Sequence, residues 1–149
     1  MNAVFRVLAP TLIVLSGSAT VVAADAADPC ALLTKAEVEQ ALGPLDSLPR
    51  PQTNDRLRTC DYLFRDSKQG LSVWLFPGEA TQRARKQIKK LVAVNGLGDE
   101  AFTYFQEELG YTELMVKKGD RVLQVGIPKA PGAEAKVQAL ARKALARLP

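Results

Sequence analysis

Histidine is absent from the 149-residue sequence, and only two cysteines occur in it, Cys30 and Cys60. Without an imidazole the chain cannot build a Ser-His-Asp triad, a Cys-His dyad or a histidine-ligated metal site, and it lacks the commonest general base near neutral pH. Two cysteines alone do not make a usual zinc site either. The sequence therefore predicts a protein that is not an enzyme and that has no metal and no cofactor.

Carboxylates are the main catalytic groups that remain. Asp99 with Glu100, and Glu107 with Glu108, are the sequential pairs that a glycosidase could use. Neighbouring residues on an extended strand point to opposite faces, however, so these pairs are poor candidates for a single site. We expect their side chains to be solvated, and a carboxylate-based hydrolase stays an alternative function.

The N-terminus has the pattern of an export signal. An apolar run over residues 7–14 follows an arginine, and small residues and a suitable cleavage site at Val22-Ala23-Ala24 come after it. The run is short and interrupted, which favours cleavage over a retained membrane anchor. We therefore expect residues 1–24 to be a signal peptide. Residues 25–149 should form one exported domain, periplasmic or extracellular, with no transmembrane segment after cleavage.

Both cysteines lie in the part that remains after cleavage. An even pair in an oxidising compartment favours a disulfide, which on the entropy of loop closure would stabilise the fold by roughly 3 to 4 kcal/mol. A metal pair and a catalytic thiol are the competing interpretations. Both are weakened by the missing histidine.

Turn signals divide the exported part into helices and strands. Thr34 and Glu37 have capping-box spacing ahead of a short helix that stops at Gly43-Pro44, and residues 45–56 have the composition of a loop. The later segments predict a hairpin over residues 57–64 and 71–76, a basic amphipathic helix over 79–94, strands over 101–105, 111–116 and 121–127, and a last helix. The predicted fold is a single α+β domain of order α-ββ-α-βββ-α, with helices packed on an antiparallel sheet of about five strands.

The stretch VNGLGDEAF contains two glycines and two carboxylates. A phosphate cradle would need a strand before the glycines and a helix after them, and a calcium loop would need more oxygen ligands. We expect Gly96 to end the basic helix in a left-handed conformation, with Leu97 packed back on Val92. Gly98 should provide a second turn before Asp99 or its neighbour accepts backbone N–H bonds. The stretch is thus predicted to be a structural cap and turn.

Basic side chains gather on the outer faces of the two amphipathic helices. Placed side by side, the helices would form one basic surface from Arg83, Arg85, Lys86, Lys89, Lys90, Arg142 and Lys143. Ordinary solvated faces are one interpretation of this pattern. The other is docking on an anionic partner in the cell envelope, either a polyanionic component or an acidic protein, and not on nucleic acid.

Four motifs, DPCALLTKAEVEQALG, CDYLF, GLGDEAF and KKGDRVLQVGIP, occur in this order. Together they resemble a family of small exported proteins and lipoproteins classed as a domain of unknown function, and the resemblance covers nearly all of the exported part. It implies a disulfide between the two cysteines and an αβ sandwich similar to the PsbP-like fold. It implies no catalytic residues. Members of that family often carry a lipid-attachment cysteine near the signal peptide, and this sequence departs from them there.

Two classes of function follow. The first is a non-catalytic exported protein that acts as a binding or accessory module of the cell envelope, and the second is a small-molecule carrier or hydrolase, which would need an apolar pocket with a few polar groups. Trp74 bears on the choice. Strand alternation places Trp74 with Phe76 on the face opposite Leu71, Val73 and Leu75. Because large aromatic side chains are mostly buried, we expect Trp74 beneath a helix and not as a ligand platform.

Overall fold

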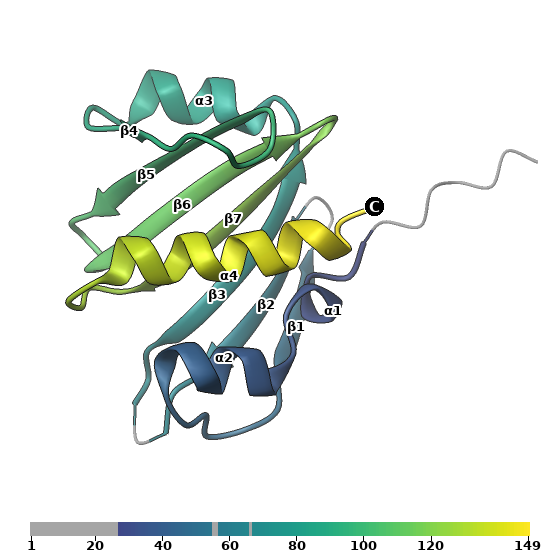
Figure 1. The fold of residues 1–149 in the computed structure, drawn as a ribbon, viewed down its shortest axis with the longest axis vertical. Coiled ribbons are helices and arrows are strands. Elements are labelled where there is room, and N and C mark those ends of the chain that lie inside the picture. The colour runs from purple at the N-terminus through teal and green to yellow at the C-terminus, as the bar shows by residue number, and fades with distance from the viewer. Residues whose placement is uncertain (1–26, 55–56, 66) are drawn as a thin grey trace, which may run out of the picture.

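The computed structural model describes residues 27–54, 57–65 and 67–149, so the expected signal peptide lies outside the described residues. Over these ranges the chain forms a seven-stranded antiparallel sheet of order β1-β2-β3-β7-β6-β5-β4, together with four helices (Figure 1). The helices are α1 (Pro29–Leu32), α2 (Lys35–Leu42), α3 (Ala80–Gln87) and α4 (Ala133–Arg147). The strands are β1 (Arg50–Asn54), β2 (Leu57–Leu63), β3 (Gly70–Pro77), β4 (Val92–Ala93), β5 (Glu100–Gln106), β6 (Tyr111–Lys118) and β7 (Arg121–Pro128).

The predicted α+β class is confirmed, but the predicted number of strands and their order are wrong. The additional strands are β1, within the segment expected to be a loop, and β4, within the segment expected to be helical. Strand β1 contains Pro51, which an edge strand tolerates because one side of it pairs with no neighbour. A further short helix, α1, precedes the predicted first helix. Both extra strands lie at the edges of the sheet, where sequence signals for strands are weakest.

The basic helix is shorter than predicted. It ends at Gln87, and Ile88 is already extended, with φ −98° and ψ 119°. The chain then forms β4, which pairs with β5 through Val92 and Ala93. Continuing the helix would have left this edge of β5 unpaired, so sheet pairing overrides the helical period.

The stretch VNGLGDEAF is a turn, but it does not cap a helix. Gly96 and Gly98 have φ values of +75° and +56°, and a Cβ on Gly98 would lie 2.3 Å from the Lys117 carbonyl oxygen. The predicted packing of Leu97 on the last turn of a helix is wrong, because Val92 lies in β4 and is 59% exposed, whereas Leu97 is 4% exposed in the main core. The Asp99 carboxylate accepts a hydrogen bond from the Gly119 N–H at 2.7 Å. Asp99 thus accepts a backbone N–H bond, as predicted, and joins the start of β5 to the β6–β7 turn.

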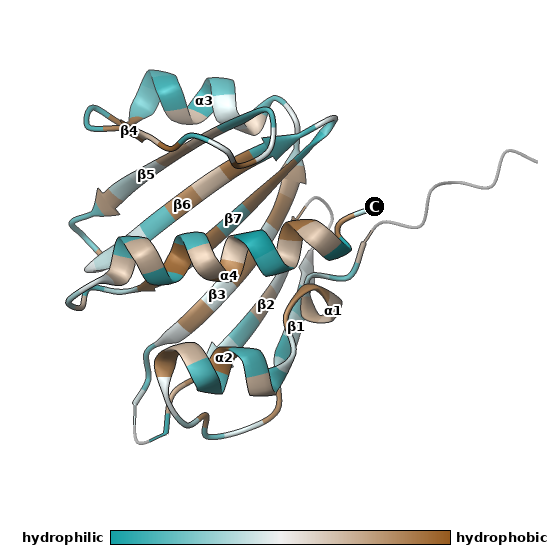
Figure 2. Cartoon of the chain, in the orientation of Figure 1, coloured by the Kyte–Doolittle hydropathy of each residue, from teal (hydrophilic) through white to brown (hydrophobic). Residues whose placement is uncertain are grey.

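The main core lies between one face of the sheet and helices α1, α2 and α4. Figure 2 shows apolar residues on β3, β6 and β7 where α4 crosses them. Helix α4 contributes Val137, Leu140, Ala141, Ala144 and Leu145 to this core, and Leu148 follows directly after the helix. The Cys30–Cys60 disulfide is confirmed and joins α1 to β2 with a Cα–Cα distance of 5.1 Å.

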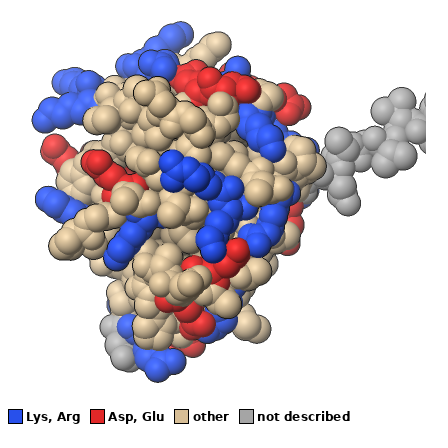
Figure 3. Space-filling view, in the orientation of Figure 1, with Lys and Arg blue, Asp and Glu red and all other residues tan. Residues whose placement is uncertain are grey.

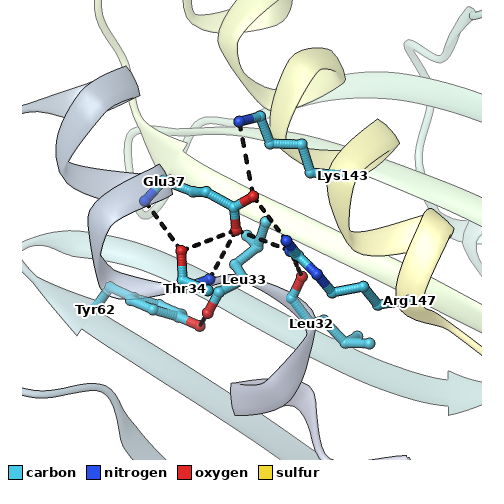
Figure 4. Close-up of polar contacts among 7 residues, drawn as sticks. All are labelled: Leu32, Leu33, Thr34, Glu37, Tyr62, Lys143 and Arg147. Carbon is cyan, nitrogen blue, oxygen red and sulfur yellow. Dashed lines mark hydrogen bonds and ion pairs between the residues drawn. The ribbon is translucent and has the colours of Figure 1, made fainter.

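Glu37 joins α2 to the last turn of α4 (Figure 4). Its carboxylate accepts hydrogen bonds from both terminal nitrogens of Arg147, at 2.8 and 2.9 Å, and completes the predicted capping box with Thr34. Lys143 lies 3.7 Å from the same carboxylate. The hydrogen bonds from Arg147, and then that from the Thr34 N–H, lower the pKa of Glu37 to about 2. Two basic side chains of α4, Lys143 and Arg147, therefore form ion pairs within the molecule.

Candidate ligand-binding site

The second face of the sheet carries α3 at one end. Ala80 and Ala84 of this helix pack against Phe102, Met115 and Val122, which alternate with the residues that face the main core. Helices α1, α2 and α4 contribute to the main core on the other face. The part of this second face that lies over β1, β2 and β3 has no helix on it within the described residues. We call the whole of this second face, which in the described residues is free of helix over these three strands, the open face.

Strand register places polar residues side by side across this face. One row runs through Asp61, Ser72, Gly126, Glu113 and Tyr104, on β2, β3, β7, β6 and β5. The next row runs through Gln52, Thr59, Trp74, Gln124, Met115 and Phe102. Residues far apart in the sequence thus form one surface, and the order of the strands creates it.

A cleft of about 720 Å³ lies between α3 and this face. Ala80 and Ala84, which are buried against the sheet, lie at the edge of this cleft. The lining is largely apolar and includes Leu57, Phe76, Pro77, Ala80, Ala84, Ile88, Tyr104 and Met115. Glu79, Arg83, Gln87 and Gln124 add a few polar groups. This composition matches the pocket that the carrier alternative required.

Glu113 is a buried carboxyl group beside this cleft. It is 5% exposed, and its carboxyl lies over Gly126, where a Cβ would approach Oε2 to 2.4 Å. Burial raises the pKa of Glu113, and a 3.1 Å hydrogen bond from the Gln124 side-chain amide opposes this effect. Burial also raises the pKa of Tyr104, with a smaller contribution from Glu113. The sequence alone does not single out Glu113, because only strand register shows that it lies opposite Gly126, which has no side chain.

Trp74 lies in the open face and not beneath α4. Its predicted position, on the side of β3 opposite Leu71 and Val73, is confirmed, but the expectation of a core position under a helix is wrong. The ring is half-buried and stacks on Phe76, with a centroid distance of 5.9 Å and an interplanar angle of 11°. It lines a second, polar pocket of about 250 Å³. Trp74 is therefore placed where it could contact a ligand.

The predicted basic surface is divided between the two faces of the sheet. Helix α3 packs on one face and α4 on the other, so Arg83 and Arg142 do not share a surface. Arg85 already has partners within the protein. Its Nε donates to Glu100 at 2.5 Å, and its guanidinium lies 5.5 Å from the centre of the Phe102 ring. Figure 3 shows the α4 side, where basic and acidic side chains lie next to one another.

The remaining predicted bases stay near α3. Lys86 is exposed on the helix, and Lys89 and Lys90 follow it and line a depression that also contains Glu107 and Glu108. Of the predicted bases, Arg83 is the one that lines the cleft. The cap-and-turn residues Gly96, Leu97, Gly98 and Asp99 lie beside Arg142 in a separate shallow depression.

Comparisons with known proteins add little to this geometry. Searches against protein-family models and against curated proteins find no match. Among solved structures, the chain is similar to a GTP-binding regulator from Thermotoga maritima, with 12% sequence identity and a TM-score of 0.42. The match covers 78% of this chain and 90% of that one. At that TM-score the similarity is too distant to support a function.

Proposed function

We propose that the chain is a non-catalytic, exported binding protein of the cell envelope, and that it holds an anionic amphiphile in the cleft beneath α3. The amphiphile is an acyl chain that ends in an acidic group. The observation that carries the proposal is the cleft itself, whose volume of about 720 Å³ lies within the range of roughly 300 to 1,000 Å³ of ligand pockets. Its apolar lining with a few polar groups is also the composition of such pockets.

An acyl chain suits the lining for a simple energetic reason. Each buried methylene group contributes about 0.8 kcal/mol, so a chain that enters the cleft gains more with every carbon it buries. The rim adds selectivity for charge. Arg83 is exposed and lines the cleft, and a guanidinium binds a carboxylate or phosphate through two parallel hydrogen bonds. In this proposal the anionic partner expected from the basic helix is the acidic end of the bound amphiphile.

Carboxylate separation favours binding over glycoside hydrolysis. Asp61 and Glu113 lie in one row of the open face, separated by β3 and β7. Three strand spacings place their Cα atoms roughly 14 Å apart. The carboxyl pairs of glycosidases are about 5 to 9.5 Å apart. Side chains that stand parallel on one sheet face keep about the separation of their Cα atoms, so this row does not bring the two carboxyl groups to glycosidase spacing.

Two observations are in keeping with an exported protein. The disulfide between Cys30 and Cys60 is the kind of bond that persists in oxidising compartments. In the part of the chain that the structure describes, no helix is long and apolar enough to cross a membrane. The proposal of export depends in addition on the sequence pattern of residues 1–24.

The test measures binding of palmitate and of palmityl alcohol to the purified protein with its disulfide intact. We expect Ala84→Phe, which fills the cleft, to weaken palmitate binding by at least about tenfold, equivalent to 1.4 kcal/mol. Arg83→Gln should weaken palmitate binding and leave palmityl alcohol unchanged. Ala139→Phe and Arg142→Gln, at exposed positions of α4 on the other face of the sheet, control for the added ring and the lost charge. Because Ala84 is buried, thermal unfolding of Ala84→Phe must match that of the wild type for its binding to be compared. Absence of palmitate binding to the wild type, or equal binding by Ala84→Phe, would contradict the proposal.

A further inference from the structure

The polar pocket of about 250 Å³ lies on the open face, next to the cleft. Its lining consists of Gln52, Thr53, Leu57, Thr59, Asp61 and Trp74. Leu57 lines both cavities, so the pocket adjoins the cleft. The other lining residues of the pocket are not part of the cleft. An aromatic ring, a carboxylate, a carboxamide and the Thr59 hydroxyl group therefore lie around one small space.

Asp61 is held in a fixed orientation with acceptor capacity to spare. The Ser72 hydroxyl donates to its Oδ1 at 2.8 Å, and the Gln52 side-chain amide donates to its Oδ2 at 2.6 Å. An ionised carboxylate can accept about four hydrogen bonds, so capacity remains beyond these two. A carboxylate donates none, and it therefore selects a ligand that brings donors of its own and disfavours an anion.

Trp74 supplies a flat apolar surface beside this carboxylate. Phe76 stacks against it almost in parallel, which limits the freedom of the indole ring. An aromatic ring has a negative face, which attracts C–H groups that carry partial positive charge. A sugar ring presents such C–H groups on its face and hydroxyl groups around its edge. The pocket offers matching surfaces for both.

We infer that this pocket binds one sugar unit of a neutral glycan, with a C–H face of the sugar on Trp74 and neighbouring hydroxyl groups donating to Asp61. Gln52 contributes an amide that both donates and accepts, and the Thr59 hydroxyl group does the same. Sugar hydroxyl groups also donate and accept hydrogen bonds, so they can pair with these groups in either direction. A quaternary ammonium could use the ring and the carboxylate, but it has no hydrogen-bonding group for the Gln52 side-chain carbonyl or the Thr59 hydroxyl.

The chain carries its own reporter for this inference, because Trp74 is the only tryptophan in the sequence. The experiment titrates chitotetraose, cellotetraose and, as the competing probe, choline into the full protein and follows the emission of Trp74 and its quenching by acrylamide. We expect a saturable change in emission and protection from acrylamide with at least one of the two oligosaccharides. Asp61→Asn should weaken binding by about tenfold, the scale of losing hydrogen bonds to a charged group.

Controls separate this site from the cleft and from a loss of folding. Gln52→Ala is a second variant, because Gln52 is exposed at the edge of the sheet and its change perturbs the fold least. Asp46→Asn, at an exposed carboxylate outside the pocket, should bind as the wild type does. Ala84→Phe should retain oligosaccharide binding, and Asp61→Asn should retain palmitate binding. A response to choline and not to the oligosaccharides, no response to any probe, or unchanged binding by both Asp61→Asn and Gln52→Ala would overturn the inference.

Discussion

At the scale of single residues, Glu113 is unusual because its surroundings disfavour its charge. Burial among strands β5, β6 and β7 raises its pKa above the ordinary value of 4.5. A carboxyl whose pKa is higher in the folded than in the unfolded state keeps its proton longer in the folded state. The free energy of unfolding therefore falls as pH rises from the unfolded value toward the folded one. Glu113 should cost stability at neutral pH and not in acid.

Replacement of Glu113 by glutamine tests this expectation. Glutamine has nearly the same shape, and its carbonyl can still accept the hydrogen bond from Gln124. We expect Glu113→Gln to be more stable than the wild type at pH 7, with a difference that shrinks toward pH 4 as the wild-type carboxyl gains its proton. Urea unfolding across this pH range measures the difference. A wild-type protein that is equally or more stable than the variant at every pH would contradict the prediction.

At the scale of secondary structure elements, the contact between α2 and α4 includes the ion pair of Glu37 with Arg147. The pKa of Glu37 is lowered to about 2, mainly by its hydrogen bonds with Arg147. A carboxyl with a lowered folded-state pKa contributes stability above its unfolded value of 4.5. That stability is lost as pH falls from 4.5 toward about 2. Acid should therefore loosen α2 from α4.

The variant Glu37→Gln should remove this dependence on acid. Glutamine retains the capping box but loses the charged pair, so we expect a loss of about 1 kcal/mol at pH 7, in keeping with a partly exposed pair. The wild type and the variant should converge in stability near pH 2. Glu134→Gln, at an exposed glutamate in the first turn of α4, is the control for both carboxyl variants. Parallel pH profiles of the wild type and Glu37→Gln would contradict the expected role of the pair.

Elements with strong local signals were predictable, and elements that depend on pairing were not. The capping box of Thr34 and Glu37 and the apolar stripe of α4 are local patterns, and both are confirmed. Strands β1 and β4 are short and lie at the two edges of the sheet, so the neighbouring strand decides whether they form. The end of α3 follows from the same cause, because pairing of Val92 and Ala93 with β5 competes with the helix.

At the scale of the whole molecule, strand order creates the candidate site. Gln52, Asp61, Trp74, Glu113 and Gln124 come from five different strands, and the order β1-β2-β3-β7-β6 makes them neighbours. Periodicity shows which side of a strand is apolar, but it does not show which strands are adjacent or which face a helix covers. For this reason the sequence predicted the two basic helices but not their separation by the sheet. The missing histidine limited the chemistry without locating the site.

The most direct test of the proposed binding face is photo-crosslinking with a palmitate analogue that carries a diazirine on its acyl chain, followed by mass spectrometric mapping of the labelled peptides. We expect labels on α3 and on the neighbouring parts of β3 and β6, at residues such as Ala84, Phe76 and Met115 that line the cleft. Excess palmitate should remove these labels, and Ala84→Phe should reduce them. Labels on α4, or labels that excess palmitate does not remove, would contradict binding beneath α3.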